Sequence, residues 1–248
     1  MCWEYGVLKS GKRAGLLGPA ILGTVLAMLA ASPLLADDDP RAAAIEGTWV
    51  PTSYSDGLLT SDGKAPPLTE EAAELYRERV AGIGDPDRQY DRTLWCAGPG
   101  IPRIMFMPYP FEIRADGEFV GFIYDWYRWH RVVDMSGAEA DAALPQTMGY
   151  PVGHWDGDTL VIETIGFTDE TILDAQGLPH SEDMRVTERI ALLPSGELED
   201  RFRIEDPEFY TAPWEAVMTY RRSDAIVGDD VCPDRIHNLE PATRKVLP

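Results

Sequence analysis

Apolar and polar residues alternate over many short segments of the chain, and turn residues separate these segments. Alternation with a period of two puts one set of side chains on each face of an extended strand, so each segment is predicted to be a β-strand. The pattern is most regular after residue 103. The predicted strands are residues 47–50, 111–114, 118–124, 152–155, 159–165, 184–193, 198–205 and 214–222.

Turn sequences typical of β-hairpins separate several of these strands. Residues 115–117 (Ala-Asp-Gly), 156–158 (Asp-Gly-Asp) and 194–197 (Pro-Ser-Gly-Glu) each separate two strands. Consecutive hairpins without helices between them favour an antiparallel β-barrel or a sandwich, and closure into a barrel removes exposed strand edges. Residues 47–49 (Gly-Thr-Trp) also resemble the Gly-x-Trp signature of lipocalins. The predicted fold is therefore mainly β, an antiparallel barrel of the lipocalin or calycin type.

One short helix is predicted near residues 69–80. Thr69 is a residue type that caps helix N-termini, and Glu70 and Glu71 would lie at the positive end of the helix dipole. A weak apolar stripe follows over the next three turns. This is the only helix that the sequence pattern predicts.

The first part of the chain has the pattern of a secretory signal peptide. Three basic residues lie between positions 9 and 13, a mainly apolar run covers residues 14–36, and three aspartates follow. We expect residues 1–36 to be removed on export to the periplasm, leaving residues 37–248 as one domain with a polar leader at 37–45. The mature protein would then have no stable membrane insertion. The alternative is a permanent anchor, because about 20 apolar residues can cross a bilayer.

Charge and cysteine content narrow the function classes. The formal net charge is -20. The negative electrostatic field of such a protein repels nucleic acid, which proteins bind through Lys and Arg. Cys2 lies in the expected signal peptide, so Cys96 and Cys232 remain and are predicted to form a disulfide in an oxidising compartment. Nucleotide-binding, zinc-protease and serine-hydrolase motifs are missing from the sequence, and neither a cofactor nor a metal is predicted.

Two carboxylates are candidates for proton transfer. Glu188 shares a strand face with apolar residues only, so it is predicted to point inward, where burial disfavours its charged form. The alternative is a structural ion pair with an arginine such as Arg103 or Arg128. Glu163 lies on a strand with two apolar faces and is the reserve carboxylate, with a solvent-exposed edge position as its alternative.

A histidine and an aromatic stretch complete the candidate site. His180 lies in a loop just before the strand of Glu188, where it would act as an acid or base, or would merely organise the turn. Tyr124, Trp126, Arg128 and His130 would share one face if residues 124–131 were extended. That face would bind a flat apolar substrate, with core packing of the aromatic side chains as the alternative.

Four segments of the chain carry a family resemblance. They are residues 96–103 (CAGPGIPR), 153–161 (GHWDGDTLV), 177–182 (GLPHSE) and 206–214 (DPEFYTAPW). As a set they resemble a large family of uncharacterised exported bacterial proteins. The resemblance implies export and assigns no catalytic residue.

These observations lead to one main hypothesis. A cofactor-independent acid-base enzyme, a lyase or an isomerase, would act on a small hydrophobic molecule bound in the barrel. Glu188 and His180 would move protons, while Tyr124 and Arg128 would orient the substrate. The alternative is a lipocalin-like periplasmic carrier that releases its ligand unchanged. A third possibility is an envelope structural protein without a pocket.

Overall fold

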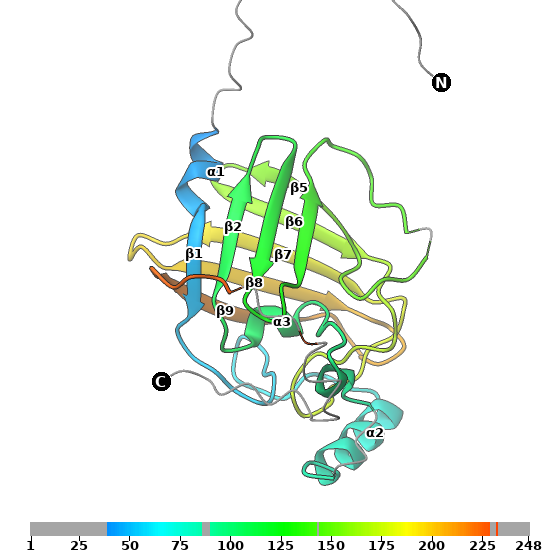
Figure 1. The fold of residues 1–248 in the computed structure, drawn as a ribbon. Helices are drawn as coiled ribbons and strands as arrows, with labels where there is room; N and C mark the ends of the chain where they lie inside the picture. The colour runs from blue at the N-terminus through cyan, green and yellow to red at the C-terminus, as the bar shows by residue number, and fades with distance from the viewer. Residues whose placement is uncertain (1–38, 86–89, 143, 229–231, 233–248) are drawn as a thin grey trace, which may run out of the picture. The chain divides into compact units, whose positions relative to one another are not determined.

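Nine β-strands form one closed barrel in their sequence order (Figure 1). The structure is a computed structural model that describes residues 39–85, 90–142, 144–228 and 232. The strands are β1 (Gly47–Pro51), β2 (Phe111–Ala115), β3 (Phe119–Tyr124), β4 (His130–Asp134), β5 (Tyr150–Asp156), β6 (Thr159–Ile165), β7 (Arg185–Leu192), β8 (Leu198–Glu205) and β9 (Trp214–Arg222). β9 pairs with β1 and closes the barrel. The predicted fold class is confirmed.

All strands predicted from the alternating pattern are present, and one strand was missed. The missed strand is β4, which follows a tight turn at residues 125–129. In this turn Tyr127 and Arg128 have positive φ angles of 47° and 59°. The residues 124–131 are therefore not one extended segment, and the sequence alternation is broken at the turn.

One strand pair departs from the antiparallel pattern. β4 and β5 are parallel and are joined only at Asp134 and Val152, whereas every other neighbouring pair is antiparallel. Two parallel neighbours cannot be joined by a tight hairpin, so a longer connection leads from β4 to β5.

The predicted helix is present as α2 (Glu70–Ala81), and the Thr69 hydroxyl accepts the backbone N–H of Ala72. Three short helical segments were not predicted: α1 (Pro40–Ile45), the 3-10 helix η1 (Arg92–Trp95) and α3 (Arg103–Phe106). The expectation of a polar leader at 37–45 is wrong, because Asp39 caps α1 and Ile45 is buried. The described residues include no helix that is long and apolar enough to cross a membrane. The expected signal peptide lies outside the described residues.

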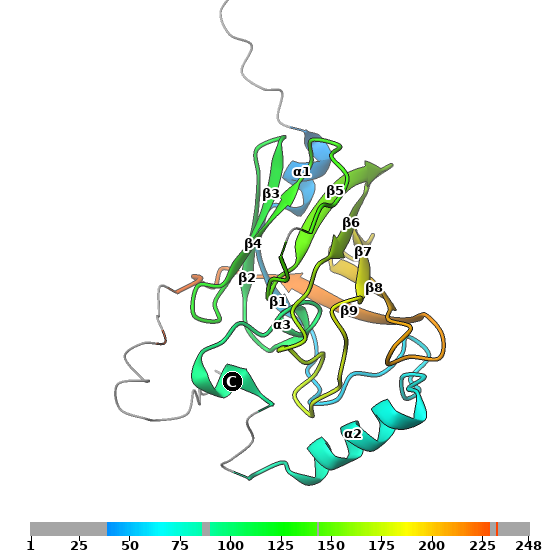
Figure 2. The same ribbon diagram turned by 90° about the vertical axis from the view of Figure 1, so that its right-hand side faces the viewer.

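Large side chains fill the interior of the barrel. The ring of Phe111 packs edge-on against Tyr220, with ring centroids 4.9 Å apart, and both belong to one cluster of buried residues. Trp49, in the predicted first strand, is fully buried and donates its indole N–H to the carbonyl oxygen of Ile45 at 2.8 Å. These aromatic side chains thus belong to the packed core of the barrel. In both views α1 lies at one end of the barrel and α3 at the other (Figures 1 and 2).

The predicted disulfide between Cys96 and Cys232 is present, with 5.7 Å between the Cα atoms. It joins positions 136 residues apart, so it restricts a long loop in the unfolded chain. Cys96 directly follows η1, so the disulfide also fixes the segment that leads to α3.

Replacing Cys96 by serine tests this contribution. We expect the Cys96→Ser variant to lose about 2–4 kcal/mol of unfolding free energy, because its unfolded chain gains the freedom of an open loop. Urea unfolding with and without a reductant measures the loss. Reduced wild type should match the variant, and a variant as stable as the oxidised wild type would contradict the prediction.

Candidate functional site

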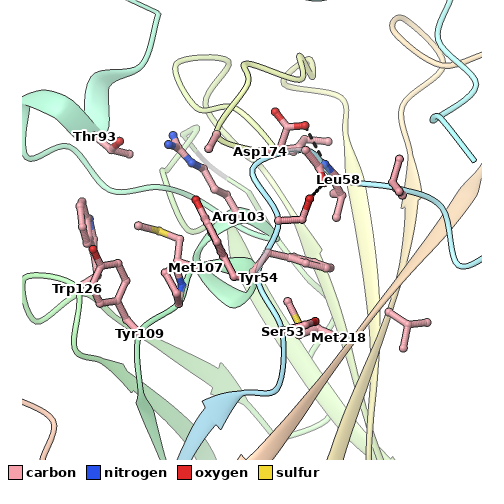
Figure 3. Close-up of a pocket in the computed structure, with 18 of the residues that line it drawn as sticks. Ser53, Tyr54, Leu58, Thr93, Arg103, Met107, Tyr109, Trp126, Asp174 and Met218 are labelled. Carbon is pink, nitrogen blue, oxygen red and sulfur yellow. Dashed lines mark hydrogen bonds between the residues drawn. The ribbon is translucent and has the colours of Figure 1, made fainter. Parts of the chain in front are cut away.

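A cavity of about 540 Å³ lies at the end of the barrel that carries α3 (Figure 3). Its walls come from the loop after β1, the segment from η1 to β2, the turn after β3, residues 173–175 and the middle of β9. The lining is mostly apolar, and its apolar members are Leu58, Leu59, Leu94, Phe106, Met107, Pro108, Tyr109, Trp126, Leu173, Ala175, Val217 and Met218. Such a lining suits a small apolar molecule.

A buried ion pair holds one wall of the cavity. The Arg103 guanidinium donates to both carboxylate oxygens of Asp91, at 2.9 and 3.1 Å, and both side chains are less than one-tenth exposed. The Thr93 hydroxyl donates to the same carboxylate at 2.6 Å. This arrangement ties the start of η1 to the start of α3, so the chain between them has a fixed course.

A second carboxylate holds the opposite wall. Asp174 accepts the backbone N–H of Leu58 at 3.0 Å and the hydroxyl of Tyr76 at 2.8 Å. It also accepts the backbone N–H groups of Gln176 and Leu178, both at 2.9 Å. One side chain therefore joins the loop after β1 to α2 and to its own loop. Neither Asp174 nor Asp91 stands as an isolated base in the cavity.

Two aromatic side chains bring polar atoms to the cavity. The Tyr54 hydroxyl donates to Asp56 at 2.5 Å, and burial together with this carboxylate raises the pKa of Tyr54, which keeps the phenol neutral. The indole of Trp126 lies against the rings of Tyr109 and Tyr127, with centroids 5.0 and 4.6 Å away. Its Nε1–H is buried and has no hydrogen-bond partner among the described residues.

Glu188 points inward as predicted, but it is bound in an ion pair. Its two oxygens accept hydrogen bonds from Arg131 at 2.5 and 2.7 Å, and neither side chain is accessible to solvent. The partner is neither Arg103 nor Arg128, which were the expected alternatives. The turn at 125–129 reverses the alternation, so Arg131 points into the barrel opposite Phe122. Glu188 does not contribute to the cavity lining.

Asp200 is a buried carboxyl group that the sequence reading missed. It lies on β8 two residues from Phe202, the strand partner of Glu188, so it is on the same inner face, and it is fully buried. Neither of its oxygens has a hydrogen-bond partner among the described residues. Burial, together with the nearby charge of Glu188, raises the pKa of Asp200 well above its ordinary value. Two buried carboxyl groups thus lie near the single Arg131, and this arrangement favours the protonated form of Asp200.

His180 is buried outside the cavity. Its Nδ1 lies 2.9 Å from the carbonyl oxygen of Ser181, which can only accept a hydrogen bond, so Nδ1 carries the proton. Nε2 then accepts from the Thr171 hydroxyl at 2.7 Å. Burial lowers the pKa of His180, which agrees with a neutral ring. These contacts favour the alternative in which His180 organises its loop.

The remaining predicted site residues are dispersed. Glu163 is exposed on the outer face of β6, so the expected shielding is wrong. Tyr124 is part of the barrel core, whereas Arg128 and His130 are exposed, and the expected common face does not form because of the turn at 125–129. Among the predicted catalytic and substrate-binding residues, only Trp126 lines the cavity.

Comparison with known proteins adds little to this picture. No protein-family model matches the chain, and no curated protein matches it. Among solved structures, a mutant of the REP1-NXSQ fatty acid transporter is similar over 73% of this chain and 99% of its own, with 12% identity and a TM-score of 0.33. A likeness at this score carries no argument about function.

The ion pair of Glu188 predicts a large stability effect. We expect the Glu188→Gln variant to lose about 3–5 kcal/mol of unfolding free energy, because Arg131 would keep its charge in the core without a carboxylate. Glu163→Gln is the matched control, since its exposed side chain should change stability by less than about 0.5 kcal/mol. Urea unfolding of both variants measures the difference. Equal stability would contradict the structural role of Glu188.

Replacement of Asp200 is expected to raise the stability of the protein, in contrast to Glu188→Gln, and the gain should depend on pH. The pKa of the Asp200 carboxyl group is higher in the folded state than in the unfolded state. Above about pH 4 the unfolded chain therefore releases the Asp200 proton more readily than the folded state does. The folded state consequently loses stability as the pH rises. Asparagine cannot ionise, and we expect Asp200→Asn to be more stable than wild type at neutral pH, with the advantage shrinking toward pH 4. Thermal unfolding across this pH range measures it. A variant less stable at neutral pH would contradict the assignment.

Proposed function

We propose that the protein is a non-catalytic carrier of a small, largely apolar molecule, which it holds in the cavity at the α3 end of the barrel. The observation that carries the proposal is the cavity itself, whose volume of about 540 Å³ falls in the usual range for small-molecule sites. Burial of an apolar ligand against this lining would drive binding, and the unbranched side chains of Met107 and Met218 can adapt to its shape.

The polar groups of the cavity support binding more than chemistry. General acid-base catalysis needs a proton donor or acceptor within hydrogen-bond reach of the substrate. The carboxylates Asp91 and Asp174 are already bound by several protein donors, and Tyr54 is neutral. Glu188 and His180, which the enzyme hypothesis requires, are held by Arg131 and Thr171 outside this lining. The enzyme hypothesis stays a prediction without support from the geometry of the site.

An exported, periplasmic location fits this proposal. The basic and apolar pattern of residues 1–36 and the resemblance to exported bacterial proteins both favour export. The disulfide between Cys96 and Cys232 suits an oxidising compartment, and it lies next to η1, which contributes to one wall of the cavity.

Binding of a neutral fluorescent probe tests the proposal. N-phenylnaphthylamine should bind to the mature protein with increased fluorescence, and Met107→Arg should weaken binding at least about tenfold, because a charge would then lie in the apolar lining. Leu192→Arg is the control, since it makes the same charge change at the end of β7, outside the cavity lining, where Leu192 is 40% exposed. Equal binding by both variants would contradict this location.

A second measurement separates the carrier from the enzyme. The mature protein is incubated with a pool of small hydrophobic metabolites, and bound and free compounds are compared by mass spectrometry and chromatography. We expect the enriched compounds to be recovered unchanged. A product of altered mass, or a new isomer that is lost in the His180→Ala variant, would contradict the carrier proposal and favour the acid-base enzyme.

A further inference from the structure

The indole N–H of Trp126 is an unused hydrogen-bond donor in the lining of the cavity. Trp126 is only 4% exposed, and its Nε1 has no partner among the described residues. Buried donors in native proteins are almost always paired, so each exception requires an explanation. We infer that the ligand is an uncharged molecule with a carbonyl oxygen, and that this oxygen accepts the hydrogen bond of Trp126. The inference rests on the proposed carrier function and specifies its ligand.

Two groups of the lining, the indole of Trp126 and the guanidinium of Arg103, have hydrogen-bond donors and no acceptor atom. Indole can only donate a hydrogen bond, and it has no acceptor atom. Arg103 has five N–H groups, and the two contacts with Asp91 leave several of them for other acceptors. A ligand that satisfies these groups must therefore offer an acceptor. A carbonyl oxygen offers this acceptor without adding a donor hydrogen that would need a partner of its own.

The charges around the cavity exclude an anionic ligand. Asp91 already balances the charge of Arg103, and Asp174 adds a further carboxylate to the lining. A ligand carboxylate would therefore face two negative groups and one balanced cation in a partly desolvated site. The formal net charge of -20 opposes its approach as well. A ketone, ester or amide carbonyl accepts the same hydrogen bond without this cost.

The ligand can reach the indole N–H through a small rearrangement. Figure 3 shows Trp126 and Tyr109 together at one side of the cavity, with the side chain of Met107 beside them. Methionine has three rotatable bonds and a flexible, polarizable side chain. Because the indole nitrogen has almost no exposed surface, binding would involve a rotamer change of the lining, for which Met107, half-buried in the same cavity, is suited.

Three size-matched probes test the inference: isopropylnaphthalene, acetonaphthone and naphthoate. Equilibrium dialysis against wild type, Trp126→Phe and Trp95→Phe gives their affinities. Phenylalanine keeps an aromatic ring at position 126 and removes the N–H, while Trp95 is 49% exposed and lies outside the lining. In wild type and Trp95→Phe, acetonaphthone should bind about fivefold more tightly than isopropylnaphthalene, and naphthoate should bind most weakly.

In Trp126→Phe the preference for acetonaphthone over isopropylnaphthalene should disappear, because a phenyl ring cannot donate. An unchanged preference in this variant, or naphthoate as the tightest ligand of wild type, would overturn the inference and leave the carrier proposal standing. If none of the three probes binds to wild type, the proposed function itself fails. The two failures are therefore distinguishable.

Discussion

The closed, filled barrel is the constraint on which the rest of the structure depends. Nine strands pair around the ring, and aromatic side chains together with the ion pair of Arg131 and Glu188 occupy the interior. A buried ion pair is costly to desolvate, so it is stable only when its geometry is well made, as the two hydrogen bonds to Glu188 are here. Because packed side chains and a buried charge pair fill this space, the cavity proposed to bind a ligand lies at an end of the barrel.

The walls of the end cavity depend on polar anchors, and regular secondary structure contributes little to them. Loops carry backbone groups that no strand satisfies, and here Asp91 and Asp174 satisfy them or fix their position. The same carboxylates consequently already accept hydrogen bonds from protein groups. The rest of the lining is mostly apolar and includes some hydrogen-bond donors. The disulfide adds a covalent tie beside η1. The hydrogen bonds of Asp91 and Asp174 thus stabilise these loops and also keep the two carboxylates from acting as free groups in the cavity.

The strands and the disulfide could be predicted because each depends on local or countable features. Alternation defined β6, β8 and β9 at their observed bounds, and two cysteines in the expected mature chain allow one pairing. β4 was missed because the turn at Tyr127 and Arg128 interrupts the alternation without a glycine or proline to mark it. The inward direction of Glu188 followed from its neighbours on the strand, but its partner could not, since Arg131 meets it only through the closed barrel.

The cavity could not be predicted because its lining comes from five separate segments whose proximity is set by the barrel. Methyl-labelled methionines give the most direct test of the claim that ligands bind there. If ligands bind in the cavity, N-phenylnaphthylamine shifts the NMR methyl signals of Met107 and Met218, which line it, and leaves the signal of the buried Met184 unchanged. A shift of the Met184 signal without a shift of the Met107 and Met218 signals would place the ligand elsewhere and would contradict binding in the cavity.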